Sequence, residues 1–249
     1  MKAGIGDGWF RRYEAAAPGE RLVVLPHAGG SAAFYHRWGA SFGPETEVLV
    51  ACYPGRHTRL DEPLVRGMDV LADRLTAALL PFTDLPLTLF GHSMGASLAH
   101  EVALRLEARH SVRVAGLHVS SRKPPHRLTP RGLHLEDDRA LIAEVVRLGG
   151  ADAAALAAPE LRALVLPAIR ADFEIAETYG PRAAVPVGCP VHAYGGDRDP
   201  AVSTADLAAW ADIAPAGFRW SVLTGGHFYL VDRHTELTGA LARSLGGVR

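Results

Sequence analysis

A serine between two glycines is the first feature of this sequence whose residue types and spacing could do chemistry. Residues 91–95 read Gly-His-Ser-Met-Gly, which matches the G-x-S-x-G pattern that presents a serine hydroxyl as a nucleophile. With 26 glycines in 249 residues, the pattern alone is weak evidence. Its flanks strengthen it, because residues 87–90 have the composition of a buried strand and residues 96–103 that of a helix. Ser93 is therefore predicted on a tight strand-to-helix turn, at a helix N-terminus that favours developing negative charge.

A serine hydroxyl is a weak nucleophile and needs a base that an acid orients. In hydrolases built on this turn, the chain order is Ser, then Asp or Glu, then His. The sequence supplies Asp197 and Asp199 after one strand-like run and His227 after another. Pro200 biases Asp199 toward extended backbone, whereas Asp197 follows two glycines and suits a turn cap. On these grounds Asp199 is preferred as the acid, and Asp197 stays open.

The same chemistry needs two N–H groups that face the developing oxyanion. One is expected to be the backbone amide of Met94, the residue after the serine. The other is expected from the small, Gly-rich loop of residues 26–30, with Ala28 as the donor. The remaining histidines near these segments are expected to be structural: His27, His118, His192 and His234.

Strand-like and helical runs alternate along the chain, which predicts a mostly parallel sheet with helices on both faces. The strand-like runs are residues 21–25, 47–52, 86–90, 114–119, 190–194 and 218–223. The helical patterns between them are residues 70–80, 96–108, 204–211 and 235–245. Residues 121–187 break this rhythm, because they contain helical segments at 137–148 and 160–179 but no strand. We therefore expect a single domain over residues 1–249, an α/β-hydrolase fold with a helical lid insertion at approximately 121–187.

Composition excludes several other classes of protein. A formal net charge of -1 gives no electrostatic reason to expect nucleic acid or an anionic membrane as a partner. The N-terminal residues lack the apolar core of a signal peptide, and no apolar stretch reaches the length of a membrane span. Cys52 and Cys189 lie in apolar runs and are expected to be buried residues rather than a disulfide. Without a signal peptide or a membrane span, we expect a cytoplasmic enzyme. Because the histidines do not lie at a spacing typical of metal ligands, we expect it to hold no metal.

Further segments make the sequence resemble the stand-alone type II thioesterases of polyketide and nonribosomal peptide assembly lines. The matching segments are Leu25–Ser31, Tyr53–Arg56 with Arg59–Pro63, Phe90–Ala96, Leu166-Pro167 with Arg170–Phe173, Gly196–Pro200 and Gly225–Leu230. This resemblance implies Ser93 as the nucleophile, His227 as the base and Asp199 as the acid. It also implies the N–H groups of Ala28 and Met94 as the oxyanion hole.

The activity that the resemblance implies is hydrolysis of acyl groups from the phosphopantetheine arm of carrier proteins. Such hydrolysis removes misprimed or stalled acyl units, and it needs no cofactor in the enzyme because the substrate carries the phosphopantetheine. The alternatives are a carboxylesterase or lipase that acts on oxygen esters, a chain-releasing domain, and a non-catalytic binding module. A start at Met1 without a carrier domain weighs against the chain-releasing domain, and the complete Ser, Asp and His set weighs against the binding module.

The expected partner is an acyl or peptidyl carrier protein of a polyketide or nonribosomal peptide synthase, met by a monomer. The resemblance implies that carrier proteins are acidic, and the start of the insertion is basic. Its cations, Arg122, Lys123, Arg127 and Arg131, are either a docking surface or an ordinary solvated stretch. The sequence departs from the family at Tyr53, where leucine is expected more often, and we expect this departure not to affect the chemistry.

Overall fold

A single twisted sheet organises the computed structural model, which describes residues 3–6, 8–149, 156 and 158–245. In the described part of the chain the sheet has eight strands in the order β1-β2-β4-β3-β5-β6-β7-β8. Strands β3 to β8 run parallel to one another. Strand β2 is antiparallel to both of its neighbours, β1 and β4. The bounds are β1 Ala3–Gly6, β2 Phe10–Tyr13, β3 Glu20–Leu25, β4 Thr46–Ala51, β5 Leu87–His92, β6 Gly116–Ser120, β7 Val191–Gly196 and β8 Phe218–Leu223.

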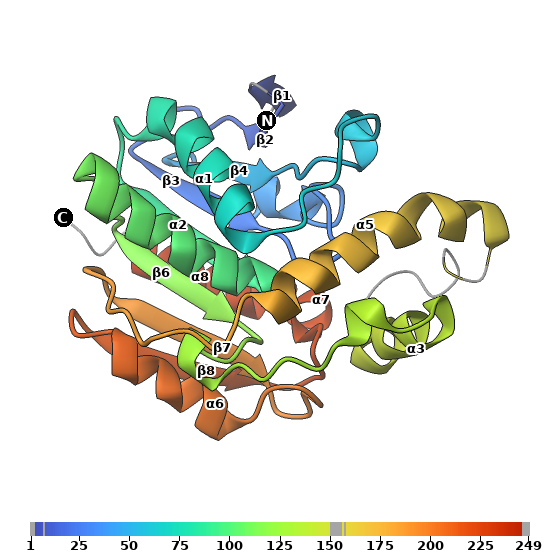
Figure 1. Ribbon diagram of the computed structural model, residues 1–249. Coiled ribbons are helices and arrows are strands. Elements are labelled where there is room, and N and C mark those ends of the chain that lie inside the picture. Colours follow the sequence, from blue (N-terminus) through green and yellow to red (C-terminus); the bar gives the residue numbers. More distant parts are fainter. Residues whose placement is uncertain (1–2, 7, 150–155, 157, 246–249) are drawn as a thin grey trace.

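Helices cover both faces of this sheet (Figure 1). Val23 and Leu25 of β3 pack in the core beneath α1 and α2, whereas Leu22 and Val24 pack in the core beneath α8. This alternation follows from the two-residue period of a strand, and it explains why four successive residues of β3, Leu22 to Leu25, are all apolar. The helices outside the insertion are α1 Met68–Leu79, α2 Met94–His110, α6 Thr204–Ala208, α7 Tyr229–Asp232 and α8 His234–Leu245.

The predicted alternation of strands and helices is confirmed, with boundaries that shift by a few residues. The predicted helix at 204–211 ends as α6 at Ala208 and continues as a 3-10 helix to Ile213. The strands β1 and β2 were not predicted. A four-residue strand with two arginines has no clear pattern of its own, and β2 exists because it pairs with the edge of β4.

The chain between β6 and β7 contains no strand among its described residues. Its longest elements are α3 Asp138–Leu148 and α5 Pro159–Thr178, which agree with the two predicted helical segments. Both lie beyond the carboxyl ends of the parallel strands (Figure 1). That edge of an open α/β sheet is where ligands bind, so these helices lie where they can cover a site. We call residues 121–187 the insertion.

No helix in the described part of the chain is long and apolar enough to cross a membrane.

Candidate active site

Ser93 lies on the turn that joins β5 to α2, as the motif predicted. Its backbone has φ 54° and ψ −120°, a conformation that residues with a side chain rarely adopt. A Cβ on Gly91 would strike the carbonyl of Gly95, and a Cβ on Gly95 would strike the carbonyl of Leu25. The two glycines are therefore needed because the turn brings three backbone segments into contact.

The side chains of Ser93, His227 and Asp199 form a continuous hydrogen-bonded chain. The Oγ atom of Ser93 lies 3.0 Å from Nε2 of His227, and Nδ1 of His227 lies 2.9 Å from Oδ2 of Asp199. Burial alone would raise the pKa of Asp199, but the hydrogen bond and charge of the His227 ring outweigh it and lower that pKa. An ionised carboxylate at this position fixes the ring so that Nε2 can accept the hydroxyl proton.

Asp197 lies two residues before Asp199 and makes a different contact. Its Oδ1 atom accepts a hydrogen bond from the Gly225 amide at 2.8 Å, and its side chain is 45% exposed. It therefore caps the turn before His227, which is the turn-capping position suggested by the two preceding glycines. Hydrogen bonding to the Gly225 amide also lowers the pKa of Asp197.

The two residues whose amides are predicted to form the oxyanion hole lie beside Ser93. Met94 is the first residue of α2, and the first N–H groups of a helix have no partner within it. In the loop of residues 26–30, the Gly29 amide donates to Asp172 and the Gly30 amide donates to the His27 carbonyl. Among the described contacts of that loop, the amides of His27 and Ala28 have no partner. Ala28, Met94 and Ser93 line the same cavity.

Two further histidines lie near His227, but their environment is different. His27 Nδ1 lies 3.2 Å from the Tyr35 hydroxyl, and His92 Nδ1 lies 2.9 Å from the Ser120 hydroxyl. Burial, followed by the proximity of His227, lowers the pKa of His27 to about 3 and the pKa of His92 well below its ordinary value. Both rings are therefore neutral near pH 7 and poor bases, which agrees with the structural role expected for His27.

Two cavities meet at Ser93 beneath the insertion. The smaller has a volume of about 200 Å³ and an apolar lining that includes Phe34, Val145, Ile169 and Phe228. The larger has a volume of about 420 Å³. Its lining includes the charged residues Arg122, Lys123, Arg131, Glu144, Arg147 and Glu177. Ser93 and His227 line both cavities, so a substrate bound there could extend in two directions of unlike polarity.

The four cations at the start of the insertion differ in their surroundings, and Arg122 does not fit an ordinary solvated stretch. Arg122 donates to the Ser97 hydroxyl and the Ala176 carbonyl, and burial lowers its pKa to about 10. Lys123 pairs with Asp206, and Arg131 pairs with Glu144. The remaining cation, Arg127, is exposed and has no ion pair with the described residues. Arg122, Lys123 and Arg131 line the larger cavity together, whereas Arg127 is not part of its lining.

Two residues contact the site although the sequence indicated no role for them there. Ser121, which directly follows β6, contacts the His227 carbonyl through its hydroxyl at 3.3 Å. Its position after a parallel strand was the available signal. Tyr53 is the departure from the family that was expected not to affect the chemistry. Its hydroxyl donates a hydrogen bond of 3.0 Å to the Pro26 carbonyl, at the start of the loop that contains Ala28. No sequence pattern indicates that contact.

Comparisons with known proteins agree over nearly the whole chain. Residues 20–245 match the thioesterase domain family. The thioesterase PikA5 of Streptomyces venezuelae is 43% identical over 239 residues, which cover 95% of this chain and 85% of PikA5. The solved structure of BorB, a type II thioesterase from the borrelidin biosynthetic cluster, is similar with a TM-score of 0.86 and 39% identity, over 96% of this chain and 97% of BorB. YbtT, a type II thioesterase from the yersiniabactin NRPS/PKS pathway, gives a TM-score of 0.85 and 28% identity, over 95% of this chain and 98% of YbtT.

Proposed function

The chain belongs to the thioesterase family, as a type II thioesterase of polyketide and nonribosomal peptide clusters with an α/β-hydrolase fold. On this premise we propose that it hydrolyses acyl groups from the phosphopantetheine arm of acyl or peptidyl carrier proteins, removing misprimed or stalled units. The observation that carries the proposal is the hydrogen-bonded chain from Ser93 through His227 to Asp199, at the junction of two cavities.

The proposed reaction passes through an acyl-enzyme. Ser93 Oγ attacks the thioester carbonyl while His227 Nε2 takes the hydroxyl proton, and the Ala28 and Met94 amides stabilise the oxyanion. The carbon–sulfur bond then breaks and His227 returns the proton to the leaving thiolate. In the second half, His227 takes a proton from water, the resulting hydroxide attacks the acyl carbonyl, and the acid leaves as Ser93 regains its proton. A thiol with a pKa of about 8.5 leaves readily, so this step asks little of the acid.

The two cavities support a division of the substrate between them. The smaller cavity is lined by aromatic and aliphatic side chains, which suit the acyl group. The larger cavity presents charged groups that suit the amides and phosphate of a phosphopantetheine arm. The insertion lines both cavities, because Leu148 of α3 and Phe173 of α5 contribute to each. In this proposal residues 121–187 act as the lid of a single domain.

The same proposal extends to the setting of the reaction. The enzyme acts as a monomer in the cytoplasm, beside the synthase whose carrier proteins it serves, and it needs no cofactor of its own. The carrier protein itself brings the phosphopantetheine arm. Ser93 supplies the nucleophile, His227 the base, and the Ala28 and Met94 amides the oxyanion donors.

Replacement of the nucleophile tests the proposal most directly. Ser93→Ala is expected to lower turnover by about a million-fold, because loss of a triad nucleophile removes the covalent route. The assay measures acid release from an acyl-carrier protein and from a matched oxygen ester, with circular dichroism to show that the fold is retained. A variant with more than a small part of the wild-type rate would refute the assignment of Ser93. Faster cleavage of the oxygen ester by the wild type would favour the carboxylesterase alternative.

A further inference from the structure

The loop that contains Ala28 is held by polar side chains from two other parts of the chain. Asp172, on helix α5 of the insertion, accepts the Gly29 amide hydrogen bond at 2.7 Å. Arg56, in the segment after β4, donates to Asp172 through both of its terminal nitrogens at 2.5 and 2.8 Å, and to the Gly30 carbonyl at 3.3 Å. The Tyr53 hydroxyl donates to the Pro26 carbonyl at 3.0 Å. We call Tyr53, Arg56 and Asp172 the loop clamp.

The charged pair of the loop clamp is almost fully buried. The side chains of Arg56 and Asp172 are 11% and 2% exposed. Burial alone would lower the pKa of Arg56, but the adjacent Asp172 carboxylate outweighs it, so the arginine stays charged. Because desolvation offsets the attraction between buried charges, such a pair is weak evidence of a contribution to stability. Its location suggests another purpose, since one carboxylate oxygen accepts both from the arginine and from a backbone amide of the loop.

Helix α5 also packs directly on this loop. Gly29 has φ +74°, and a Cβ there would lie 2.7 Å from Cγ1 of Ile169, one turn before Asp172 on the same helix. The loop therefore meets α5 through both a close apolar contact and a hydrogen bond. Displacement of α5 would remove both contacts together.

We propose that Tyr53, Arg56 and Asp172 are positioning residues that hold the loop of residues 26–30 so that the Ala28 amide faces the oxyanion. Because Asp172 belongs to the insertion, the oxyanion hole is complete only while α5 rests on the loop, and this links lid position to catalysis. The proposal rests on the catalytic assignment above. An oxyanion donor accelerates the reaction because it is already oriented when charge develops, so a displaced Ala28 amide lowers kcat more than substrate binding.

A buried charge left alone could unfold the protein, so the test replaces both partners together. Arg56→Met with Asp172→Leu keeps the volume and removes the buried pair, an exchange that is often neutral for stability. It also removes the acceptor for the Gly29 amide. On a small acyl thioester that needs no carrier protein, we expect kcat to fall by about 10- to 100-fold, with KM and the shape of the pH profile unchanged. Tyr53→Phe, which removes only a hydroxyl, should lower kcat by a smaller factor.

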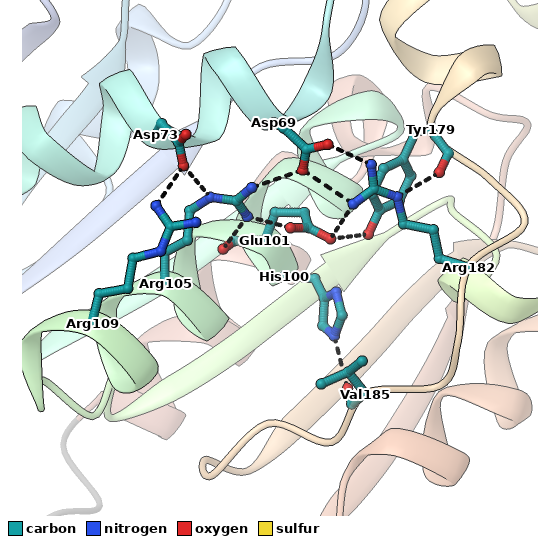
Figure 2. Close-up of polar contacts among 9 residues, drawn as sticks. All are labelled: Asp69, Asp73, His100, Glu101, Arg105, Arg109, Tyr179, Arg182 and Val185. Atoms are coloured by element: carbon teal, nitrogen blue, oxygen red, sulfur yellow. Dashed lines mark hydrogen bonds and ion pairs between the residues drawn. The ribbon is translucent and has the colours of Figure 1, made fainter.

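A second buried network provides the matched control (Figure 2). Glu101 on α2 accepts hydrogen bonds from Arg105 and from the hydroxyl of Tyr179. Tyr179 is the residue that directly follows α5. This network also ties the insertion to the core, but none of its contacts reaches the loop of residues 26–30. Glu101→Leu with Arg105→Met is the equivalent replacement and should leave kcat near the wild-type value.

The measurements are kcat and KM across pH, with thermal unfolding of each variant and Ser93→Ala in parallel. Loss of activity in Ser93→Ala establishes the catalytic assignment independently of the clamp. Lower kcat in both clamp variants, with normal activity in the control, supports the proposal. Wild-type kcat in the double clamp variant would overturn it, as would an equal loss in the control. A shifted pH profile would also overturn it, because it would show an effect through His227 and Asp199 rather than through the oxyanion donor.

Discussion

At the scale of single residues, the two aspartates after β7 show how a short distance along the chain separates two roles. Asp199 contacts the ring of His227 with both carboxylate oxygens, at 2.9 and 3.1 Å. Asp197 accepts the Gly225 amide instead. One carboxylate holds the ring of His227, and the other holds the turn that precedes it.

This difference predicts unequal effects of the same substitution. Asp199→Asn is expected to lower turnover by about ten-thousand-fold, because the histidine loses the partner that fixes its tautomer and orientation. Asp197→Asn should cost far less, since an amide oxygen can still accept the Gly225 hydrogen bond. Steady-state hydrolysis of a small acyl thioester by both variants checks the ranking. The opposite ranking would show that Asp197 is the acid.

At the scale of secondary structure elements, α3 carries a cluster of charges whose described hydrogen bonds do not involve Ser93, His227 or Asp199. Glu144 pairs with Arg131, in the segment before α3, and with Arg147, one turn further along the helix. Hydrogen bonds from Arg147 and then from Arg131 outweigh burial and lower the pKa of Glu144 from 4.5 to about 2. The cluster therefore fixes α3 to the start of the insertion, as long as the carboxylate stays ionised.

The lowered pKa of Glu144 predicts how the cluster responds to acid. In the unfolded chain Glu144 takes up a proton near pH 4.5, whereas in the folded chain it does so only at about pH 2. The stabilisation is therefore complete above pH 4.5 and is lost as the pH falls through this window. Glu144→Gln should be less stable than the wild type at neutral pH, and this deficit should shrink below pH 4.5. Urea unfolding of both proteins across this range measures it, and a constant deficit would contradict the prediction.

At the scale of the whole molecule, basic and acidic residues almost balance, at 26 and 27. The formal net charge is -1, so attraction to the proposed carrier protein would depend on local surface rather than on total charge. The first basic residues of the insertion are mostly engaged within the protein, with Arg122 half-buried and hydrogen-bonded, and Arg131 paired. Arg127 is the cation of that segment whose exposure suits a docking contact.

Reversal of this exposed charge tests the docking surface. Arg127→Glu is expected to raise KM for acyl-carrier protein by a few-fold, because a single rim charge acts mainly on encounter rate. The effect should weaken as salt is added. Hydrolysis of a small acyl thioester should not change, and Arg219→Glu, on the outer strand β8, serves as a control for net charge. Equal effects of Arg127→Glu on both substrates would show that this residue shapes the lid instead.

The sequence by itself determined the parallel core of the fold and the identity of the residues that meet at Ser93. Strands and helices of the core carry their own periodicity, and the nucleophile turn needs glycines at fixed offsets from Ser93. Ser93, Asp199 and His227 each follow the carboxyl end of a parallel strand. Because β5 to β8 lie side by side in the sheet, these three residues come together at one edge. These signals are local, so they can be recognised without coordinates.

Tertiary structure alone decided the contacts between distant segments that carry no such signal. Strand β2 exists because β4 offers an edge, and Arg122 is drawn into the protein because α2 and α5 offer it hydrogen-bond acceptors. The pair of Arg56 and Asp172 joins residues 116 positions apart. The Tyr53 hydroxyl can donate its hydrogen bond only because the fold places the Pro26 carbonyl opposite it. Such contacts depend on how the insertion packs against the sheet, and that packing is a property of the whole chain.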